Sequence, residues 1–437
     1  MCRASTASRG RSPRTSTLTN ERLFSYIAAM QAPAINLYDQ DVYERSGPPH
    51  EQFRWLREHE PVRWHEIPGD TGFWAVTRYK DVFAVSLDSK TFSSARGGVI
   101  PRTWKDDEYE PQKGLLVNMD APEHTRYRRL VSLIFAHKHV KRLEDSIRAT
   151  TTELIDKVVA TGECDFVASI SAELPLRVIV ELLGIPQADR HKVLEWSNKM
   201  MGFDDPEYQT DPMVPQIAAA ELFMYANELA QERLAHPRED IVSHLLHAEV
   251  EGDRLTLTQF NSFVLLLAVA GNETTRNLIS GGMLTLMQHP DQRARLLADP
   301  SLLDTAVEEM LRWVAPVNQF RRTATRDTEL AGVRIKENDK VVVFYASANR
   351  DADVFPEPDR FDVGRTPNEH LAFGIGPHFC LGANLARLEI RVMFEELLRR
   401  LPDMQLAGPV ERLRSNFING IKRMPVRFTP ERLRAQA

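Results

Sequence analysis

Residues 373–382 read Phe-Gly-Ile-Gly-Pro-His-Phe-Cys-Leu-Gly and form the most informative stretch of the chain. Gly374 and Gly376 tolerate backbone angles that other residues avoid, so the segment before the cysteine can fold into a tight loop. Helical spacing starts directly after Cys380 and continues to Leu401, which predicts that the cysteine sits at the first turn of a helix. Free N–H groups and the positive end of the helix dipole lie at such a turn. Both favour the thiolate, so we expect a pKa below the ~8.5 of a free cysteine.

An isolated cysteine is most often an inert, small hydrophobic residue, but its neighbours here form a specific pattern. Phe-x-x-Gly-x-x-x-Cys-x-Gly is matched in full from Phe373 to Gly382, and in this the chain resembles the cytochrome P450 family of haem-thiolate monooxygenases. The resemblance implies that Cys380 is the axial thiolate ligand of haem b iron and that His378 meets a haem propionate. Phe373 would shield the sulfur, and Gly382 would let a flat ligand approach. A zinc site built on Cys380 and His378 is excluded, because two ligands cannot close one.

The longest helical pattern, Leu257 to Gln288, is interrupted by Ala-Gly-Asn-Glu-Thr at residues 270–274. A glycine inside a helix costs ~1 kcal/mol relative to alanine, and threonine can bond a carbonyl one turn back and bend the helix. We therefore expect a distortion of the kind often found at functional sites. The stretch resembles the family's Ala/Gly-Gly-x-Asp/Glu-Thr motif, which implies that Glu273 relays protons inward and that Thr274 holds the dioxygen and its waters. Peroxide-driven family members typically lack this pair, so it favours an enzyme that uses O2.

Glu309 and Arg312 lie three residues apart on one face of a predicted helix. By themselves they would form a surface ion pair of little value. Residues 358–361, Pro-Asp-Arg-Phe, resemble the Pro-x-Arg-Phe element of the family. The resemblance implies that Arg360 joins the pair in a buried network that locks the cysteine loop in place.

The two propionates of haem require cationic or hydrogen-bonding partners, and arginine suits carboxylates. His124 and Arg128, four residues apart on one helix, match propionate-binding positions of the family, as does Arg322. Arg321 is the competing choice for Arg322. On the bare sequence each of these would be read as a solvated surface cation, so their role is implied by the resemblance together with the cysteine loop.

The remaining pattern predicts a mainly α chain with small β-sheets, folded as one intertwined cytochrome P450 domain without a clean linker. We expect a flexible tail at residues 1–32 and the haem domain at 33–437. Apolar spacing predicts helices at 121–135, 140–161, 172–183, 188–201, 217–234, 257–288, 302–314 and 381–401. Strand signals predict a hairpin at 61–78, strands at 329–335 and 340–345, an extended loop at 350–373 and a strand pair at 417–428.

Composition narrows the function classes. The 437 residues are 43% hydrophobic and 27% charged, ordinary globular values that exclude a disordered chain, a collagen-like fibre and a coiled coil. A net charge of −6 argues against nucleic-acid binding. Only three cysteines occur, Cys2, Cys164 and Cys380, so we expect no disulfide framework and a reducing cytoplasm. No apolar run approaches the ~20 residues of a membrane span, and we expect a monomer. The arginine-rich first twenty residues are read as a frayed tail rather than a transit segment.

Longer segments resemble a narrower bacterial group of the family, whose members hydroxylate cholesterol side chains or methyl-branched lipids at a terminal methyl group. The segments are GNETTRN at 271–277, ANRD at 348–351, GANLARLEIR at 382–391, SNFINGIKRMPV at 415–426 and MGFDDPEYQTDP at 201–212. The residues expected to line a hydrophobic substrate pocket are Val269, Ala270, Val317, Phe417, Ile418, Met201 and Phe203. Each is also compatible with ordinary core packing.

The sequence leaves no room for a flavin or iron–sulfur domain, so the resemblance implies a ferredoxin and an NAD(P)H-dependent ferredoxin reductase as electron donors. A group of basic residues has two possible interpretations: a patch that steers an acidic ferredoxin, or a plain solvated helix face. The group consists of Arg387, Arg391, Arg399 and Arg400, with Lys138 and Lys141. One alternative function is a terpene or polyketide hydroxylase of the same family. Others are a peroxide-using or isomerising haem enzyme and a non-catalytic haem-based gas sensor; neither gives the Glu-Thr pair a role.

Overall fold

The computed structural model describes residues 34–135, 140–238, 240–250 and 252–431. The predicted tail at 1–32, with Cys2, and the residue Lys138 of the expected basic patch lie outside these ranges, so the tail boundary stays a prediction. From Asn36 onward the described residues belong to one compact unit.

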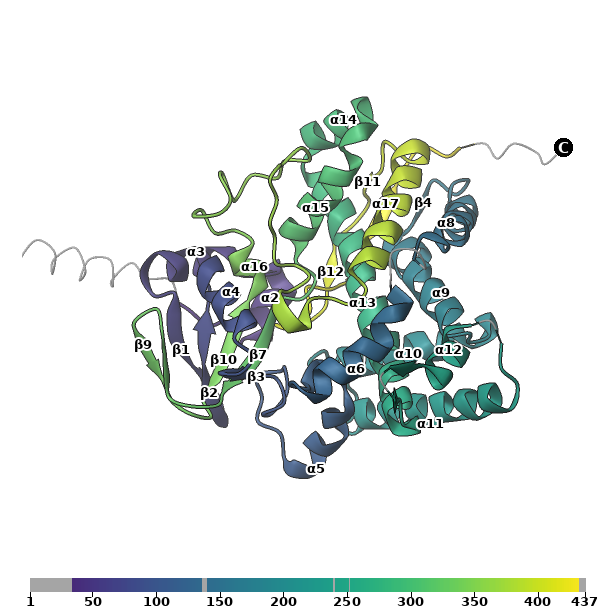
Figure 1. Ribbon diagram of the computed structural model, residues 1–437. Coiled ribbons are helices and arrows are strands. Elements are labelled where there is room, and N and C mark those ends of the chain that lie inside the picture. The colour runs from purple at the N-terminus through teal and green to yellow at the C-terminus, as the bar shows by residue number, and fades with distance from the viewer. Residues whose placement is uncertain (1–33, 136–139, 239, 251, 432–437) are drawn as a thin grey trace, which may run out of the picture. The chain divides into compact units, whose positions relative to one another are not determined.

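Helices make up most of this unit, and α13 (Leu257–Gln288) is the longest of those described. It begins with a capping box: Thr256 Oγ1 accepts the N–H of Gln259, and Gln259 Oε1 accepts the N–H of Thr256. Several helices pack against α13 (Figure 1): α9 (Glu173–Leu182), α10 (Arg190–Met201), α11 (Val214–Ala235), α15 (Leu303–Val314) and α17 (Ala383–Arg400). The others are α2 (Gln40–Ser46), α3 (His50–His59), α4 (Tyr79–Leu87), α5 (Asp106–Tyr109), α6 (Glu123–Ser132), α8 (Glu144–Val158), α12 (Ile241–His247), α14 (Pro290–Ala298) and α16 (Tyr345–Ala348).

The largest sheet of the described residues has the strand order β1-β2-β10-β7-β3. Its strands are β1 (Val62–Ile67), β2 (Asp70–Val76), β10 (Lys340–Phe344), β7 (Gln319–Ala324) and β3 (Phe92–Ser93), and only the β2–β10 pair is parallel. The smaller sheets pair β11 (Gln405–Leu406) and β4 (Glu163–Asp165) with β14 (Pro425–Arg427), β12 (Glu411–Arg412) with β13 (Ile421–Arg423), β5 (Glu249–Val250) with β6 (Asp253–Arg254), and β8 (Thr328–Leu330) with β9 (Val333–Ile335).

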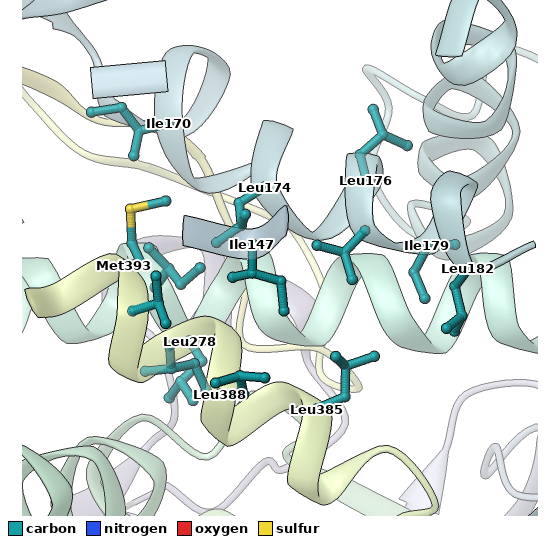
Figure 2. Packing of buried hydrophobic residues seen from close by; sticks show 14 of the residues in the cluster. Ile147, Ile170, Leu174, Leu176, Ile179, Leu182, Leu278, Leu385, Leu388 and Met393 are labelled. Carbon is teal, nitrogen blue, oxygen red and sulfur yellow. The ribbon is translucent and has the colours of Figure 1, made fainter. Parts of the chain in front are cut away.

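The hydrophobic core joins α8, α9, α13 and α17. Figure 2 shows Ile147 of α8, Leu278 of α13 and Leu388 of α17 in one cluster with the apolar side chains of α9. The approach of α9 to α13 is close, because a Cβ atom on Gly271 would lie 2.5 Å from Cδ1 of Ile179. Gly271 therefore lets the two helices pack tightly, and α13 continues through residues 270–274 without a break. A break at this point is therefore excluded, and the expected bend stays a prediction.

The predicted mainly α fold with small sheets is confirmed, including the hairpin β1–β2 and the full length of α13. Two strand predictions are wrong. Residues 329–335 form the hairpin β8–β9, which turns at Ala331 and Gly332, both with positive φ. In 417–428, β13 and β14 pair with different partners, because β13 joins β12 while β14 joins β11 and β4. Helix starts also differ, since α8 begins at Glu144 and α17 at Ala383.

Candidate functional site

Cys380 lies in a tight loop between the short 3-10 turn Gly376–His378 and helix α17. Its N–H donates to the carbonyl oxygen of Phe373, 2.9 Å away. Gly376 has φ +74°, and a Cβ atom there would also come 2.8 Å from the carbonyl oxygen of Ser86, so this position requires glycine. The residue that caps α17 is Gly382. Cys380 thus precedes the helix instead of forming its first turn, which corrects the sequence prediction.

The thiol of Cys380 has a raised pKa in the protein alone. Burial is the main cause, and a hydrogen bond from the Gly382 N–H together with the charges of Arg128 and Arg387 opposes it. The predicted lowering is wrong because desolvation of the thiolate outweighs the groups near the helix start. Phe373 is held beside this loop by the Arg387 guanidinium, which lies 4.6 Å from the centre of its ring.

A cluster of histidine and arginine side chains lies beside the cysteine loop. The rings of His124 and His378 are 4.2 Å apart between centroids. Ser94 Oγ lies 3.2 Å from His378 Nε2, and Arg128 Nη2 donates to the carbonyl oxygen of Phe379 over 2.5 Å. Burial lowers the pKa of both histidines, and nearby arginines lower it further. The residues that were predicted to bind the propionates therefore form one cluster beside the cysteine loop. They are His124, Arg128 and His378.

Arg322 supplies a further buried cation. It is 4% exposed, and Nη1 donates to the carbonyl oxygen of Arg321. Its charge also lowers the pKa of His378. Arg321, the competing choice, is engaged elsewhere, because its guanidinium donates to the carbonyl oxygens of Arg102 and Arg96. The geometry thus favours Arg322 over Arg321 in the cluster.

Glu273 and Thr274 are neighbours on α13 with different surroundings. Glu273 is 1% exposed, and its Oε2 accepts a hydrogen bond from Arg276 Nη2. Burial raises the pKa of Glu273, while Arg276 opposes that rise. Thr274 Oγ1 donates to the carbonyl oxygen of Ala270 over 2.7 Å, the bond to the preceding turn that the sequence suggested. Ala270 itself is exposed within this otherwise buried stretch. The helix thus presents a small residue and a hydroxyl on an accessible face, next to a buried acid.

Glu309 and Arg312 form a fully buried, bidentate ion pair with distances of 2.7 and 2.8 Å. The third partner is Arg365, whose Nε lies 3.1 and 3.2 Å from the two Glu309 oxygens. The prediction that Arg360 fills this place is wrong. Arg360 contributes its carbonyl oxygen to Arg312, while its side chain pairs with Glu357 at the surface.

Five of the seven predicted pocket residues meet in one apolar cluster. Met201 and Phe203, from the end of α10 and the loop after it, pack with Phe417, Ile418 and Val317. Val317 and Ile418 also form an isolated β-bridge. The other two, Val269 and Ala270, lie on α13 outside this cluster. The sequence analysis did not predict three further members of this apolar cluster, Leu413, Tyr208 and Phe320. In the sequence, their only signal is their position beside predicted elements.

Ion pairs tie the loop after α10 to the C-terminal strands. Asp205 is fully buried, and its carboxylate lies 2.9 Å from Lys422 Nζ and accepts the N–H of Arg414 over 3.0 Å. Glu207 pairs with Lys422 and with Arg423 at 3.1 and 2.5 Å. These contacts therefore join two segments that lie far apart in the sequence and that both contribute residues to or near the apolar cluster.

From the carboxyl group of Asp204, in the loop after α10, we predict that the stability of the protein depends on pH. Burial raises the pKa of its carboxyl to about 6, against the charge of Arg414 and a hydrogen bond from Gln40. Because the folded-state pKa lies above the unfolded value of ~3.9, stability is fully present below that value and is lost as pH rises through about 6. We expect Asp204→Asn to remove this step from a series of melting temperatures between about pH 4 and pH 7. Asp41→Asn, which alters an exposed partner of Arg414, is the control. Identical pH profiles for Asp204→Asn and the parent would contradict the assignment.

The four arginines expected to form a basic patch all carry acidic partners. Arg387 pairs with Glu308, Arg391 with Glu144, Arg399 with Glu396, and Arg400 with Asp156 and Glu431. Much of their charge is neutralised locally, which favours the plain helix face over a steering patch.

Comparison with known proteins places this geometry in a family. The sequence model of the family described as Cytochrome P450 matches residues 214–402. A steroid C26-monooxygenase of Mycolicibacterium smegmatis is 43% identical over 87% of this chain and 91% of its own length. A methyl-branched lipid omega-hydroxylase of Mycobacterium tuberculosis is 40% identical over 92% of this chain and 95% of its own. A Mycobacterium marinum cytochrome P450 in complex with pseudoionone superposes with a TM-score of 0.84 at 41% identity, covering 91% of this chain and 99% of the other.

The chain belongs to the cytochrome P450 family. It has the P450 fold, it is a haem-thiolate monooxygenase, and its cofactor is haem b. Its substrates are O2 and a hydrophobic molecule. The gas-sensor alternative is set aside with this assignment. Within the ranges that the structure describes, none of the helices combines the length and the apolar character needed to cross a membrane.

The residues of this P450 fit the cofactor. His124 Nε2 is buried without a hydrogen-bond partner among the described residues, as expected for a group that meets a propionate. Beside Cys380, a Cβ atom on Gly382 would enter open space with nothing within 4 Å, so a flat ring can approach there. Cys380 supplies a sulfur whose charge a metal ion would stabilise, since a coordinating thiol is deprotonated outright.

Proposed function

We propose that this P450 hydroxylates the terminal methyl group of a steroid side chain or of a methyl-branched lipid. The observation that carries the proposal is the identity of 40–43% with relatives named for these two reactions, over about nine-tenths of the chain. The apolar cluster around Phe417 and Ile418 supports it, because it gathers aliphatic and aromatic side chains of the kind that would contact such a substrate. The segments after α10 and before β13 both contribute to this cluster, so tertiary contacts assemble it.

The energy of burying such a substrate is adequate. A branched chain of about ten carbons gains up to ~8 kcal/mol at ~0.8 kcal/mol per CH2 group. That corresponds to a dissociation constant near ~1 µM before the costs of binding are subtracted. Val269 and Ala270 are small enough to leave room for a methyl end beside α13, and we propose that they define the position of the carbon to be oxidised.

The proposed reaction gives each predicted site residue a role. Bound haem with a thiolate ligand supplies the reductive activation of O2 and the insertion of oxygen. We propose that Cys380 ligates its iron, that His124, Arg128, Arg322 and His378 hold its propionates, and that Phe373 covers the sulfur. Glu273 takes up protons at its carboxylate and passes them toward Thr274, whose hydroxyl orients the dioxygen and its waters. Burial keeps Glu273 able to hold a proton, because it raises the pKa of the carboxyl.

Thr274→Ala is expected to keep substrate binding and to divert electrons from product to peroxide. The hydroxyl that donates to the Ala270 carbonyl is lost, and general acid–base catalysis of this kind contributes about 10²–10⁴-fold. The measurement is product and peroxide formed per NAD(P)H consumed. Thr285→Ala is a matched control, because Thr285 makes the same bond to Gly281 farther along α13. Full coupling in Thr274→Ala would reject the role.

We further propose a ferredoxin and an NAD(P)H-dependent ferredoxin reductase as electron donors, and the cytoplasm as the location, which the small number of cysteines supports. Because the arginines of α17 are paired, the proposal does not depend on a steering patch there.

A spin-shift titration of the purified protein tests the substrate class. The panel holds cholest-4-en-3-one, a methyl-branched fatty acid, a linear terpene alcohol and a compact bicyclic terpene. A tight low-to-high-spin shift with the first two supports the proposal. A response to the terpenes alone would keep the monooxygenase chemistry and favour terpene hydroxylation, the second candidate, which the structural similarity to a P450 solved with pseudoionone makes worth testing.

A further inference from the structure

Glu308 of α15 joins the segments that lie on either side of Cys380 in the sequence. Arg387 of α17 donates to both oxygens of its carboxylate, from Nε over 2.7 Å and from Nη2 over 2.8 Å. His370, in the segment that leads to Phe373, places its Nε2 3.0 Å from Oε2 of the same carboxylate. One acid therefore connects the helix that follows the cysteine with the loop that precedes it.

The hydrogen bonds of His370 define the charge of this group. Its Nδ1 accepts the N–H of Ala372 over 3.2 Å, so the proton of the neutral ring lies on Nε2 and is donated to Glu308. Burial by itself would raise the pKa of Glu308, but the hydrogen bonds from Arg387 and His370 lower it to about 2. The group therefore consists of one anion, one cation and one neutral ring.

Arg387 connects this group to the cysteine in two ways. Its guanidinium lies 4.6 Å from the centre of the Phe373 ring, within the range of a cation–π contact, and the carbonyl oxygen of Phe373 accepts the N–H of Cys380. Burial raises the pKa of the Cys380 thiol, and the charge of Arg387 is one of the influences that oppose this rise. The guanidinium therefore bears both on the backbone that presents the sulfur and on the charge of the sulfur.

Glu308 offsets the charge that Arg387 exerts on the sulfur. The side chains of Arg387 and Glu308 are 36% and 29% exposed, so water screens their charges only in part. Uptake of one electron by the bound cofactor adds one negative charge on the side of the sulfur. An unbalanced positive charge on Arg387 would favour the reduced form, and an unbalanced negative charge on Glu308 would disfavour it.

We propose that Glu308 and Arg387 are positioning residues that set the reduction potential of the bound haem. Arg387 supplies a positive charge toward the sulfur and contacts the loop through Phe373. Glu308 holds the guanidinium in place and balances its charge, while His370 fixes the carboxylate from the loop without adding a charge. This inference rests on the proposed ligation of the haem iron by Cys380.

The test is a potentiometric titration of the haem-loaded enzyme with dithionite and mediators at pH 8, where an ordinary histidine is neutral. Glu308→Gln keeps the size of the side chain and leaves Arg387 unbalanced, so we expect the equilibrium constant of one-electron reduction to rise about threefold to tenfold. Arg387→Gln is expected to lower it by the same factor. This is the effect of a unit charge about 10–15 Å away at an effective dielectric constant of about 20, reduced by screening. It corresponds to about 30–60 mV at about 59 mV per tenfold change.

Two further variants separate charge balance from structural damage. The double variant Glu308→Gln with Arg387→Gln removes both charges, and its equilibrium constant is expected to return to within about twofold of the parent. Arg387→Lys keeps the charge without the planar fork, and it is expected to stay within about twofold as well. If both remain as far from the parent as Arg387→Gln, charge balance is not the cause.

The ion pair of Arg391 and Glu144 provides the matched control. Arg391 lies one turn farther from Cys380 on α17, about 6 Å along the helix axis, and its Nη2 is 2.8 Å from the Glu144 carboxylate. The arginine charges that act on the Cys380 thiol are those of Arg128 and Arg387. Arg391→Gln and Glu144→Gln are therefore expected to change the equilibrium constant by less than about twofold. Shifts of the same sign in Glu308→Gln and Arg387→Gln, or shifts no larger than those of the control variants, would overturn the inference.

The spectrum of the reduced carbon-monoxide complex distinguishes this inference from the ligation on which it rests. If the parent protein lacks the thiolate band, the ligation by Cys380 fails, and the inference fails with it. If the parent and the Glu308 and Arg387 variants all show the band while their reduction potentials are equal, only the role of the Glu308–Arg387 pair fails.

Discussion

Cys380→Ser is expected to abolish the absorption band that thiolate ligation gives to the reduced carbon-monoxide complex, and with it substrate hydroxylation. A serine hydroxyl cannot replace the thiolate, which pushes electron density onto the iron and favours O–O cleavage. The loop that presents residue 380 should survive, because the backbone bond from its N–H to the Phe373 carbonyl does not involve the sulfur. The measurement is the difference spectrum of the reduced protein with and without carbon monoxide.

Cys164→Ser is the matched control for this experiment. Cys164 is a partly buried, free cysteine of β4, and burial raises its pKa to about 12, so it is an inert thiol. The variant is expected to keep the parent spectrum and activity. Persistence of the thiolate band in Cys380→Ser would mean that the ligand assignment is wrong.

Arg312→Ala is expected to lower the free energy of unfolding by about 3–5 kcal/mol, the cost of removing one partner from a buried ion pair. Glu309 would be left fully buried with Arg365 and Asn368 as its remaining side-chain partners. Arg312 also donates to the carbonyl oxygens of Asn349 and Pro358, so the loop that leads to the cysteine would lose its anchor as well. We expect loss of haem to accompany unfolding. Chemical denaturation and the haem-to-protein ratio measure the two effects.

The two neighbouring arginines make this prediction sharper. Arg365→Ala should also destabilise the protein strongly, because its side chain is 9% exposed and contacts Glu309. Arg360→Ala should change stability by less than ~0.5 kcal/mol, as expected for a surface pair. The reverse order of the two effects would show that Arg360, as the sequence motif suggested, is the true third partner.

Much of the fold was predictable because its signals are local. The apolar spacing of residues 257–288 extends over a whole helix, and the hairpin at 61–78 carries its own turn. The predictions failed where neighbours far apart in sequence decide the outcome. A single residue separates the strands β13 and β14, yet each pairs with a segment that local pattern does not reveal. Gly271 shows the same limit, because its role in the close approach of α9 depends on a helix far away in the sequence.

By itself the sequence determined the chemistry of this protein. Cys380 in its glycine-rich loop, and Glu273 followed by Thr274, are short motifs whose residue types suit the roles that we propose for them. The tertiary structure decided which side chains surround them. It placed Arg365 instead of Arg360 against Glu309, raised the pKa of the Cys380 thiol by burial, and bridged Glu273 to Asn198 through Arg276. The reason is physical: residue identity sets what a group can do, while burial, charge and hydrogen-bond partners depend on which segments pack together.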